Sequence, residues 1–514
     1  MTFEPPLRFN AWDYFLGDRL REGAGERTAL ITDSGSLTYA DVAARAERFA
    51  ALLSSRDVRP EERVLIALSD TEDWVAAFFG TLRHGSVVVM LNPHLKPEQI
   101  RYQLEYTRAR AAFVSAESRP GFEEASADAR HRPDLIEIGT DAFEAELAGA
   151  GPADDVFPAH RDDAAIWLYS GGTTGQPKAV VQSHRSFANT TELYAKGVLG
   201  MGPDDVTLSV PKLFFGYATG LNLLFPFAVG ATATLFSGRC TTEALVEKLR
   251  ERRPTILVNV PTMVNHLLSD DGVTAEDFAS LRMATSAGEA LPAELHRRWN
   301  ELCGVPLLDG LGTAEMWHIF VTNRPGDVKP GSLGRVVEGF DLEVRDEDGA
   351  PLGPDEVGYL WVRGDSRAIG YWQQMEKTRD AFRGEWYVSG DMISMDAAGY
   401  VTYHGRGDDM LKVSGKWLSP QELENCLLEH TAVEEVAVVG VATDEGLVKP
   451  RAFVIPAADR PGNDALAAEL QEWARTRLEP YKYPRDVIFM DDLPRTHLGK
   501  VDRGALARGV SGAP

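Results

Sequence analysis

The sequence predicts an α/β protein: a large N-terminal domain of layered α/β subdomains with a β-rich subdomain, followed by a small α+β C-terminal domain. Up to about residue 333, short apolar runs alternate with amphipathic helical stretches, a pattern typical of parallel α/β layers. From about Gly334 the pattern changes to short strands separated by Gly and Asp turns, and near Gly405 it changes again. We therefore predict a domain boundary that divides the chain into residues 1–406 and 407–514.

The N-terminal layers are predicted from successive segments of different periodicity. Residues 39–53 have helical apolar spacing, and the apolar run 64–68 then reads as a buried strand. Residues 73–84 repeat the helical spacing before the apolar run 86–92. The Ala-, Asp-, Glu- and Arg-rich stretch 115–132 is predicted to be a mobile surface segment. Further strand-like runs occur at residues 111–114, 164–169, 206–210, 231–236 and 255–260.

The structure of the second half of the chain is predicted from turn residues and from a change in the residue pattern near residue 405. Residues 342–349 and 358–364 read as short strands with Gly and Asp turns, which indicates the β-rich subdomain. Beyond residue 405 the pattern predicts a helix, a strand pair and a second helix, which together make a small α+β module. These elements are expected at residues 420–429, 433–441, 450–455 and 465–478.

Composition limits the possible partners. The 514 residues include 53 Lys plus Arg and 77 Asp plus Glu, a formal net charge of −24. Surfaces that bind nucleic acid or anionic membranes need clustered basic residues, so neither partner is expected, and an anionic ligand must be held by local groups. No uncharged apolar run reaches the roughly 18–20 residues that span a bilayer, and the N-terminus lacks a signal-peptide pattern. Cys240, Cys303 and Cys426 have no paired spacing, so a reducing, cytoplasmic location is expected.

A glycine- and hydroxyl-rich loop follows the apolar run 165–168. In Ser170-Gly171-Gly172-Thr173-Thr174-Gly175-Gln-Pro-Lys178, three glycines let backbone N–H groups converge on an anion, three hydroxyls add donors and a lysine adds charge. We expect this loop to bind the phosphates of a nucleotide. It is not a Walker A loop, because Lys178 follows Pro177 and the Gly-Lys-Ser/Thr ending is missing. A plain surface turn is the alternative, and the density of donors argues against it.

This loop resembles the signature loop of the adenylate-forming superfamily, which includes acyl- and aryl-CoA synthetases, carrier-protein-loading adenylation domains and firefly luciferase. The resemblance extends from about residue 37 to residue 500, through an ordered series of motifs. It implies that ATP and coenzyme A are co-substrates, that Mg²⁺ is the metal, and that the C-terminal domain is mobile.

The resemblance assigns nucleotide contacts to motifs in the middle of the chain. The turn at Gly288 and Glu289 resembles the one that packs against adenine, although it also reads as a strand followed by a helix start. The next motif begins at Asp309 and Gly310, and its Glu315 is expected to take part in magnesium coordination.

One position departs from the family pattern. The family usually has Thr before that Glu, contacting the α-phosphate, whereas this chain has Ala314. Thr313, one residue earlier, is the candidate to supply the missing contact. Sequence alone leaves open whether it does.

Motifs near the C-terminal domain complete the series. Asp391 resembles the carboxylate that accepts hydrogen bonds from the ribose hydroxyls, although an isolated Ser-Gly-Asp is also a common turn. Arg406 resembles another nucleotide contact, and Asp408 resembles the hinge between the domains. On the far side of the hinge, Lys412 and Gly415 resemble the loop presented during thioester formation, where Gly415 would let the pantetheine arm pass.

The terminal lysine motif contains Lys500, which the resemblance places near the substrate carboxylate and the α-phosphate. A lone lysine near a C-terminus is otherwise an ordinary solvated residue. The motif thus makes Lys500, with Glu315 and Lys412, a candidate catalytic residue.

The predicted acyl pocket is most similar to that of the benzoate- and hydroxybenzoate-CoA ligase branch. Gly216, Tyr217 and His318 match residues that lie around the aryl carboxylate in that branch, and Phe215 belongs to the predicted pocket as an aromatic wall. The aromatic side chains, with Phe214 and Trp317, offer flat apolar walls suited to a ring, and His318 offers a polar contact. The alternative is that they are ordinary core aromatics.

The function implied is ATP-dependent activation of an aromatic or compact cyclic carboxylic acid as an acyl-adenylate, followed by transfer to coenzyme A. Two alternatives stay open: transfer of the acyl group to a carrier-protein thiol or another nucleophile, and an inactive nucleotide-binding relative, to which Ala314 lends some support. The sequence does not name the acid, since one substituent shifts discrimination by only a few kcal/mol. It does not give the oligomeric state either.

Overall fold

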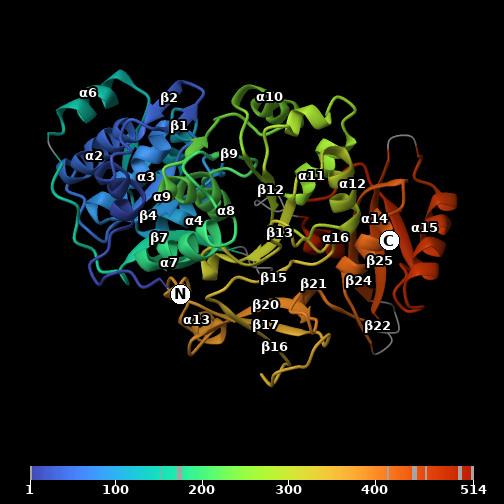
Figure 1. Ribbon diagram of the computed structural model, residues 1–514. Helices are drawn as coiled ribbons and strands as arrows, with labels where there is room; N and C mark the ends of the chain where they lie inside the picture. Colours follow the sequence, from blue (N-terminus) through green and yellow to red (C-terminus); the bar gives the residue numbers. More distant parts are fainter. Residues whose placement is uncertain are drawn as a thin grey trace.

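The structure, a computed structural model, describes residues 3–151, 153–170, 176–413, 416–442, 448–457, 460–495 and 501–510. Two large sheets form the N-terminal part, a smaller sheet follows, and the C-terminal elements pack to one side of them (Figure 1). One continuous apolar core connects the two large sheets, whereas the last helices and strands build small cores of their own. This is the α/β architecture that the sequence predicts.

The first large sheet has seven strands in the order β18-β8-β7-β4-β3-β5-β6. The pairs β3–β4, β3–β5, β4–β7 and β5–β6 are parallel, as the alternating pattern predicts, whereas β8 pairs antiparallel with both β7 and β18. Its strands are β3 (Arg63–Ala67), β4 (Val87–Met90), β5 (Ala111–Val114), β6 (Asp134–Glu137), β7 (Ala164–Ser170), β8 (Lys178–Ser183) and β18 (Gly370–Tyr371). The helices of this region are α2 (Tyr39–Ser55), α3 (Glu72–His84), α4 (Pro97–Thr107), α5 (Arg119–Ala127) and α6 (Asp141–Gly149).

Helices α2 and α3 show why these residues fold as they do. Thr38 caps α2 by accepting the N–H of Asp41, and Thr71 caps α3 by accepting the N–H of Trp74. The apolar faces predicted from the spacing are buried, and Phe49 on α2 is among the fully buried side chains.

The second large sheet has nine strands in the order β15-β14-β13-β12-β11-β9-β10-β1-β2. Its central strands are parallel, so their carboxyl ends meet at one edge, where ligands bind in open α/β sheets. The strands are β1 (Thr28–Thr32), β2 (Gly35–Thr38), β9 (Val206–Ser209), β10 (Thr232–Thr234), β11 (Ile256–Asn259), β12 (Met283–Ser286), β13 (Leu307–Gly312), β14 (Ile319–Thr322) and β15 (Arg335–Val336). The helices of this region are α1 (Asp18–Arg21), α8 (Gly216–Thr219), α9 (Phe225–Val229), α10 (Thr242–Arg252), α11 (Pro261–Ser269) and α12 (Ala293–Cys303), whereas α7 (His184–Thr190) contacts β7 and β8 of the first sheet.

The β-rich region and the C-terminal module follow the predicted order. The five-stranded sheet lies below the large sheets in Figure 1 and contains β16 (Asp341–Arg345), β17 (Gly358–Arg363), β19 (Phe382–Arg383), β20 (Trp386–Met395) and β21 (Val401–Arg406), with α13 (Met375–Ala381) beside it. The C-terminal module, drawn in orange to red in Figure 1, contains β22 (Leu411–Val413), β23 (Lys416–Leu418), α14 (Pro420–Leu428), β24 (Val433–Ala442), β25 (Val448–Pro456), α15 (Asp464–Arg477), β26 (Asp486–Phe489) and α16 (Arg503–Val510).

The prediction of a mobile surface segment at 115–132 is wrong. The structure has helix α5 there, with Phe122 and Ala125 buried against the core beside α4. Charged composition hid this helix because only two of its side chains reach the interior, while the remaining residues form a solvated face.

No helix in the described parts of the chain has an apolar run long enough to cross a bilayer.

Candidate active site

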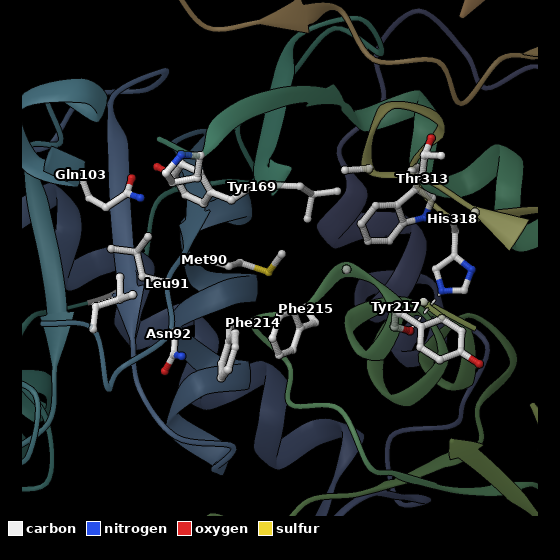
Figure 2. Close-up of a pocket in the computed structure, with 18 of the residues that line it drawn as sticks. Met90, Leu91, Asn92, Gln103, Tyr169, Phe214, Phe215, Tyr217, Thr313 and His318 are labelled. Atoms are coloured by element: carbon white, nitrogen blue, oxygen red, sulfur yellow. Dashed lines mark hydrogen bonds between the residues drawn. The ribbon is translucent and has the colours of Figure 1, made fainter. Parts of the chain in front are cut away.

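An elongated cavity of about 390 Å³ lies between the two large sheets. Its lining comes from β4, α4, the segment before α8, and the ends of β7, β12 and β13. Figure 2 shows Thr313, Tyr217 and His318 at one end of the cavity and Asn92 and Gln103 at the other. Met90 and Phe215 lie between these two ends and give the middle of the cavity an apolar surface.

The predicted phosphate loop connects two paired strands beside this cavity. Ser170 and Lys178 face each other across the antiparallel pair β7–β8, so the loop is the connection of a hairpin. Gln176 and Pro177, at its end, line the cavity, and the Tyr102 hydroxyl donates to the Pro177 carbonyl at 3.0 Å. The predicted phosphate-binding residues Gly171, Gly172, Thr173, Thr174 and Gly175 lie outside the described residues.

Lys178, Tyr371 and Glu315 form a compact polar cluster next to the loop. The Tyr371 hydroxyl donates to Glu315 Oε1 at 2.9 Å, and Lys178 Nζ lies 4.2 Å from the centroid of the Tyr371 ring. Burial lowers the pKa of Lys178, while the Glu315 carboxylate acts in the opposite direction. Glu315 is only 3% exposed, so its position is fixed by this contact. The arrangement places a cation over the face of the Tyr371 ring and an anion at its hydroxyl group.

The turn that carries Glu315 is held at both ends. Thr313 Oγ1 accepts the Met316 N–H at 3.2 Å and so caps the short helical turn Ala314–Met316. Gln182 Nε2, from β8, donates to the Ala314 carbonyl at 2.7 Å. Thr313 lines the cavity, and because its oxygen acts as an acceptor here, its hydroxyl hydrogen is available to a ligand.

A strained γ-turn follows at Trp317. This residue has φ 66° and ψ −58°, and the His318 N–H donates to the Met316 carbonyl at 2.8 Å. Such a backbone costs of order 1–3 kcal/mol for a residue with a side chain, and strain of this kind clusters at functional sites. The buried Trp317 ring lines the cavity and meets Phe187 edge to face at 4.2 Å.

Tyr217 and His318 lie together at the end of the cavity. Their ring centroids are 5.5 Å apart, and the His318 ring also packs on Phe225 at 4.8 Å. Gly312 has to be glycine here, because a Cβ atom would lie 2.5 Å from the His318 carbonyl oxygen.

The Tyr217 hydroxyl and His318 Nε2 have partners within the protein, whereas His318 Nδ1 is buried and has no partner among the described residues. His318 Nε2 lies 3.1 Å from the Tyr217 carbonyl, so Nε2 carries the proton, and the Tyr217 hydroxyl donates to Thr285 Oγ1 at 2.7 Å. Burial lowers the pKa of His318 to about 4. At neutral pH His318 is therefore an uncharged wall of the cavity, which suits a ring better than it suits a carboxylate.

The predicted adenine side is formed by the ends of β12 and β13. Gly288 borders the cavity with φ +90°, a conformation that favours glycine, and Glu289 accepts from the Thr262 hydroxyl at 2.8 Å. Gly310 and Asp309 lie on β13, where burial raises the pKa of Asp309. Asp309 Oδ1 is buried and accepts no hydrogen bond from the described residues.

Asp391 and Arg406 face each other across β20 and β21. Arg406 Nη1 donates to Asp391 Oδ1 at 3.2 Å, and the Tyr403 hydroxyl donates to the same oxygen at 3.3 Å. The two predicted nucleotide contacts are thus brought together. Asp408 lies in the short helical turn Gly407–Asp409 that connects β21 to β22.

The remaining predicted residues cannot be placed in this site. Gly415 and Lys500 lie outside the described residues, as does the side chain of Lys412 on β22. Their roles stay predictions from the motifs.

The sequence did not identify several residues of the site. Tyr371 and Gln182, which fix the Glu315 turn, come from β18 and β8, remote from it in the chain. Gln103 Oε1 and the Tyr169 hydroxyl border the cavity, are buried and have no hydrogen-bond partner within the described ranges. The only sequence signal for Tyr371 is the Gly370-Tyr371-Trp372 run, which reads as an ordinary strand.

The carboxylates near the phosphate loop determine how a metal ion could be held. Among the described residues, no three His, Cys, Asp or Glu side chains gather to hold an ion by themselves. Glu315 Oε2 accepts no hydrogen bond from a described residue, which leaves one carboxylate oxygen for a hard cation whose other ligands would be phosphate and water oxygens. The residues present fit Mg²⁺ held jointly with a nucleotide.

Comparison with known proteins gives two matches along the chain. The AMP-binding enzyme family matches residues 18–372, and the AMP-binding enzyme C-terminal domain matches residues 422–500. The chain therefore belongs to the AMP-binding enzyme family, which confirms the resemblance seen in the sequence.

Individual relatives extend over nearly the full length. The benzoate–CoA ligase of Thauera aromatica is 42% identical over 503 residues, which cover 97% of this chain and 95% of that protein. A solved benzoate CoA ligase from Burkholderia xenovorans LB400 matches with a TM-score of 0.91 and 42% identity, covering 97% of this chain and 100% of that chain. An anthranilate CoA ligase solved in complex with anthranoyl-AMP matches with a TM-score of 0.94 and 36% identity, covering 98% of each chain.

Proposed function

We propose that this protein is an ATP-dependent, AMP-forming ligase that activates an aromatic or compact cyclic carboxylic acid and transfers it to coenzyme A. The observation that carries the proposal is the composition of one cavity. Flat apolar walls at Phe215 and Trp317 suit a ring, and the same cavity is bordered by Thr313 and by the end of the predicted phosphate loop. The near full-length similarity to benzoate–CoA ligases supports the same reaction and substrate class.

In the first half-reaction the acid lies with its ring in the cavity and its carboxylate toward Thr313. The carboxylate oxygen attacks the α-phosphorus of ATP, and pyrophosphate leaves. Lys178, Thr313 and the backbone N–H groups of the phosphate loop stabilise the charge that develops on the phosphates. Glu315 would hold Mg²⁺, which would neutralise phosphate charge. The Asp391–Arg406 pair is available to the ribose.

In the second half-reaction the thiol of coenzyme A attacks the acyl carbon and displaces AMP. Lys500 is needed only in the first step, so we propose that the C-terminal domain, residues 407–514, rotates about Asp408 and presents the loop with Lys412 and Gly415 instead. In the orientation that the structure has, Ser419 Oγ donates to the His404 carbonyl across this boundary, a contact that the rotation would break.

Transfer to a carrier-protein thiol is the second candidate function, since it uses the same adenylate. We also propose a cytoplasmic location, which the three unpaired cysteines support.

A panel assay tests the proposal. Pyrophosphate release is measured with benzoate, hydroxybenzoates, anthranilate and a linear fatty acid, each with and without coenzyme A. We expect multiple turnovers only with an aryl acid plus coenzyme A, and at most one turnover without it. Sustained release with a linear acid alone, or none with any aryl acid, would contradict the proposal.

Thr313 provides a further prediction, because Ala314 lacks the hydroxyl of the family pattern. Thr313→Ala should reduce pyrophosphate exchange by roughly 10-fold or more, the effect of losing one charge-assisted hydrogen bond. Thr313→Ser is the matched control and should retain most of the activity, and Ala314→Thr should give no gain. Unchanged exchange in Thr313→Ala would show that backbone N–H groups and Mg²⁺ suffice for the α-phosphate.

A further inference from the structure

Asp70 is a buried carboxyl outside the predicted motifs. It lies in the turn between β3 and α3 and is only 5% exposed. Its two oxygens lie 3.0 Å and 3.2 Å from the backbone nitrogen of Leu213, which donates to them. Leu213 is distant in sequence and belongs to the segment that enters the cavity wall. The contact therefore ties the first large sheet to the wall of the site.

Leu213 is held from the other side as well. Thr219 Oγ1 donates to the Leu213 carbonyl at 2.6 Å and lies 3.1 Å from the Phe215 carbonyl. The side chain of Leu213 is fully buried, so the peptide groups on both sides of it are fixed. Asp70 supplies the anchor for its N–H group.

The next two residues form the aromatic wall. Phe214 and Phe215 line the cavity with ring centroids 4.4 Å apart, and Figure 2 shows both rings at its lower edge. Their direction depends on the backbone that leaves Leu213. A shift of that peptide would move both rings, because Phe214 and Phe215 follow it directly in the chain.

We propose that Asp70 is a positioning residue for acid binding: its carboxylate fixes the Leu213 amide and thereby holds Phe214 and Phe215 against the substrate ring. The inference rests on the proposed function, since it assigns those rings to the acid.

The ionisation of Asp70 gives the inference a distinctive signature. Burial raises the pKa of the Asp70 carboxyl to about 7, while Lys212 and the Leu213 N–H act in the opposite direction. Lys212 Nζ donates to the Phe236 carbonyl at 2.6 Å, and the other ionisable groups that act on Lys212 are Cys240 and Asp33. A carboxylate accepts a stronger hydrogen bond than a neutral carboxyl does. The anchor is therefore strongest when Asp70 is ionised.

Ionisation of Asp70 strengthens its hydrogen bond to Leu213 but lowers the stability of the folded protein. The pKa of the folded state lies above the ordinary value of 3.8, so the stability that the neutral carboxyl contributes is lost as the pH rises through about 7. A variant that cannot ionise should avoid this loss of stability at high pH, but its hydrogen bond with the Leu213 N–H should be weaker. If Asp70 had a merely structural role, its replacement would lower stability and acid binding together.

The test compares wild type with Asp70→Asn, which keeps an acceptor for the Leu213 N–H but cannot ionise. We expect the wild-type KM for benzoate to fall several-fold between about pH 6 and about pH 8. In Asp70→Asn the KM should be independent of pH and about 5- to 10-fold higher at pH 8, with the KM for ATP within about twofold of wild type. The Tm of this variant at pH 8 should equal or exceed that of wild type.

Two further variants complete the design. Asp73→Asn is the matched control, because Asp73 on α3 pairs with Arg45 and not with the cavity wall; it should lower Tm and leave both KM values unchanged. Asp70→Ala, which leaves the Leu213 N–H unpaired, should raise the KM for benzoate at every pH.

The inference is overturned if the KM of Asp70→Asn for benzoate keeps the wild-type pH dependence, or if both KM values rise equally. A lower Tm together with weaker acid binding would also overturn it. These outcomes require normal wild-type turnover of benzoate. Absence of wild-type turnover with every aryl acid would instead overturn the proposed function, and the inference with it.

Discussion

Replacing Glu315 by Gln is expected to slow pyrophosphate exchange by about 100- to 1,000-fold, the range found when one preorganised electrostatic group is removed. Gln still accepts a hydrogen bond from the Tyr371 hydroxyl, so the buried turn should keep its shape. The variant loses the negative charge that a divalent cation needs. Among the described residues of this cluster, Glu315 supplies the only carboxylate. The measurement is pyrophosphate exchange at increasing Mg²⁺ concentration.

Tyr371→Phe is the matched comparison, because it keeps the carboxylate and removes only the donor that orients it. It should show a smaller loss, of about 10-fold, and a higher Mg²⁺ requirement. Unfolding monitored by circular dichroism should be little changed in the Gln variant. Equal losses in both variants, or an unchanged Mg²⁺ requirement in both, would remove Glu315 from the metal site.

Replacing Lys500 by Ala is expected to abolish adenylate formation and to leave thioester formation from a supplied aryl-adenylate largely intact. The lysine charge is needed only while the carboxylate attacks and pyrophosphate departs, so only that step should lose it. The loss should be about 100-fold or more. Each half-reaction is measured separately, the first by pyrophosphate exchange and the second by thioester formation from the adenylate.

Lys449→Ala is the control for Lys500, since Lys449 is an exposed lysine of the same C-terminal module and should change neither half-reaction. Equal loss in both half-reactions of Lys500→Ala would contradict the assignment and would point to a defect in folding or in domain docking.

Secondary structure could be predicted where periodicity and burial agree. The helix expected at 39–53 is α2, and the strands expected at 433–441 and 450–455 are β24 and β25, because each has a continuous apolar face. Helix α5 was missed because Phe122 and Ala125 alone reach the core, too few to mark a helical period in a charged stretch.

The site could be predicted in composition but not in its internal contacts. Phe215, Tyr217 and His318 line the cavity, as their apolar and aromatic character suggests. The sequence cannot show that the Tyr217 hydroxyl is bound to Thr285, or that His318 is neutral, because these follow from contacts between distant segments. Asp70 and Tyr371 were missed for the same reason, since each acts on a residue far away in the chain.

The central claim is that an aryl acid is activated as an adenylate and then transferred to coenzyme A. The most direct test is a single-turnover experiment with labelled benzoate, ATP and Mg²⁺, quenched before and after coenzyme A is added. The account predicts one equivalent of enzyme-bound benzoyl-adenylate and pyrophosphate before the addition, and conversion of that adenylate to benzoyl-CoA and AMP after it. Formation of ADP and phosphate, or an adenylate that coenzyme A does not consume, would contradict it.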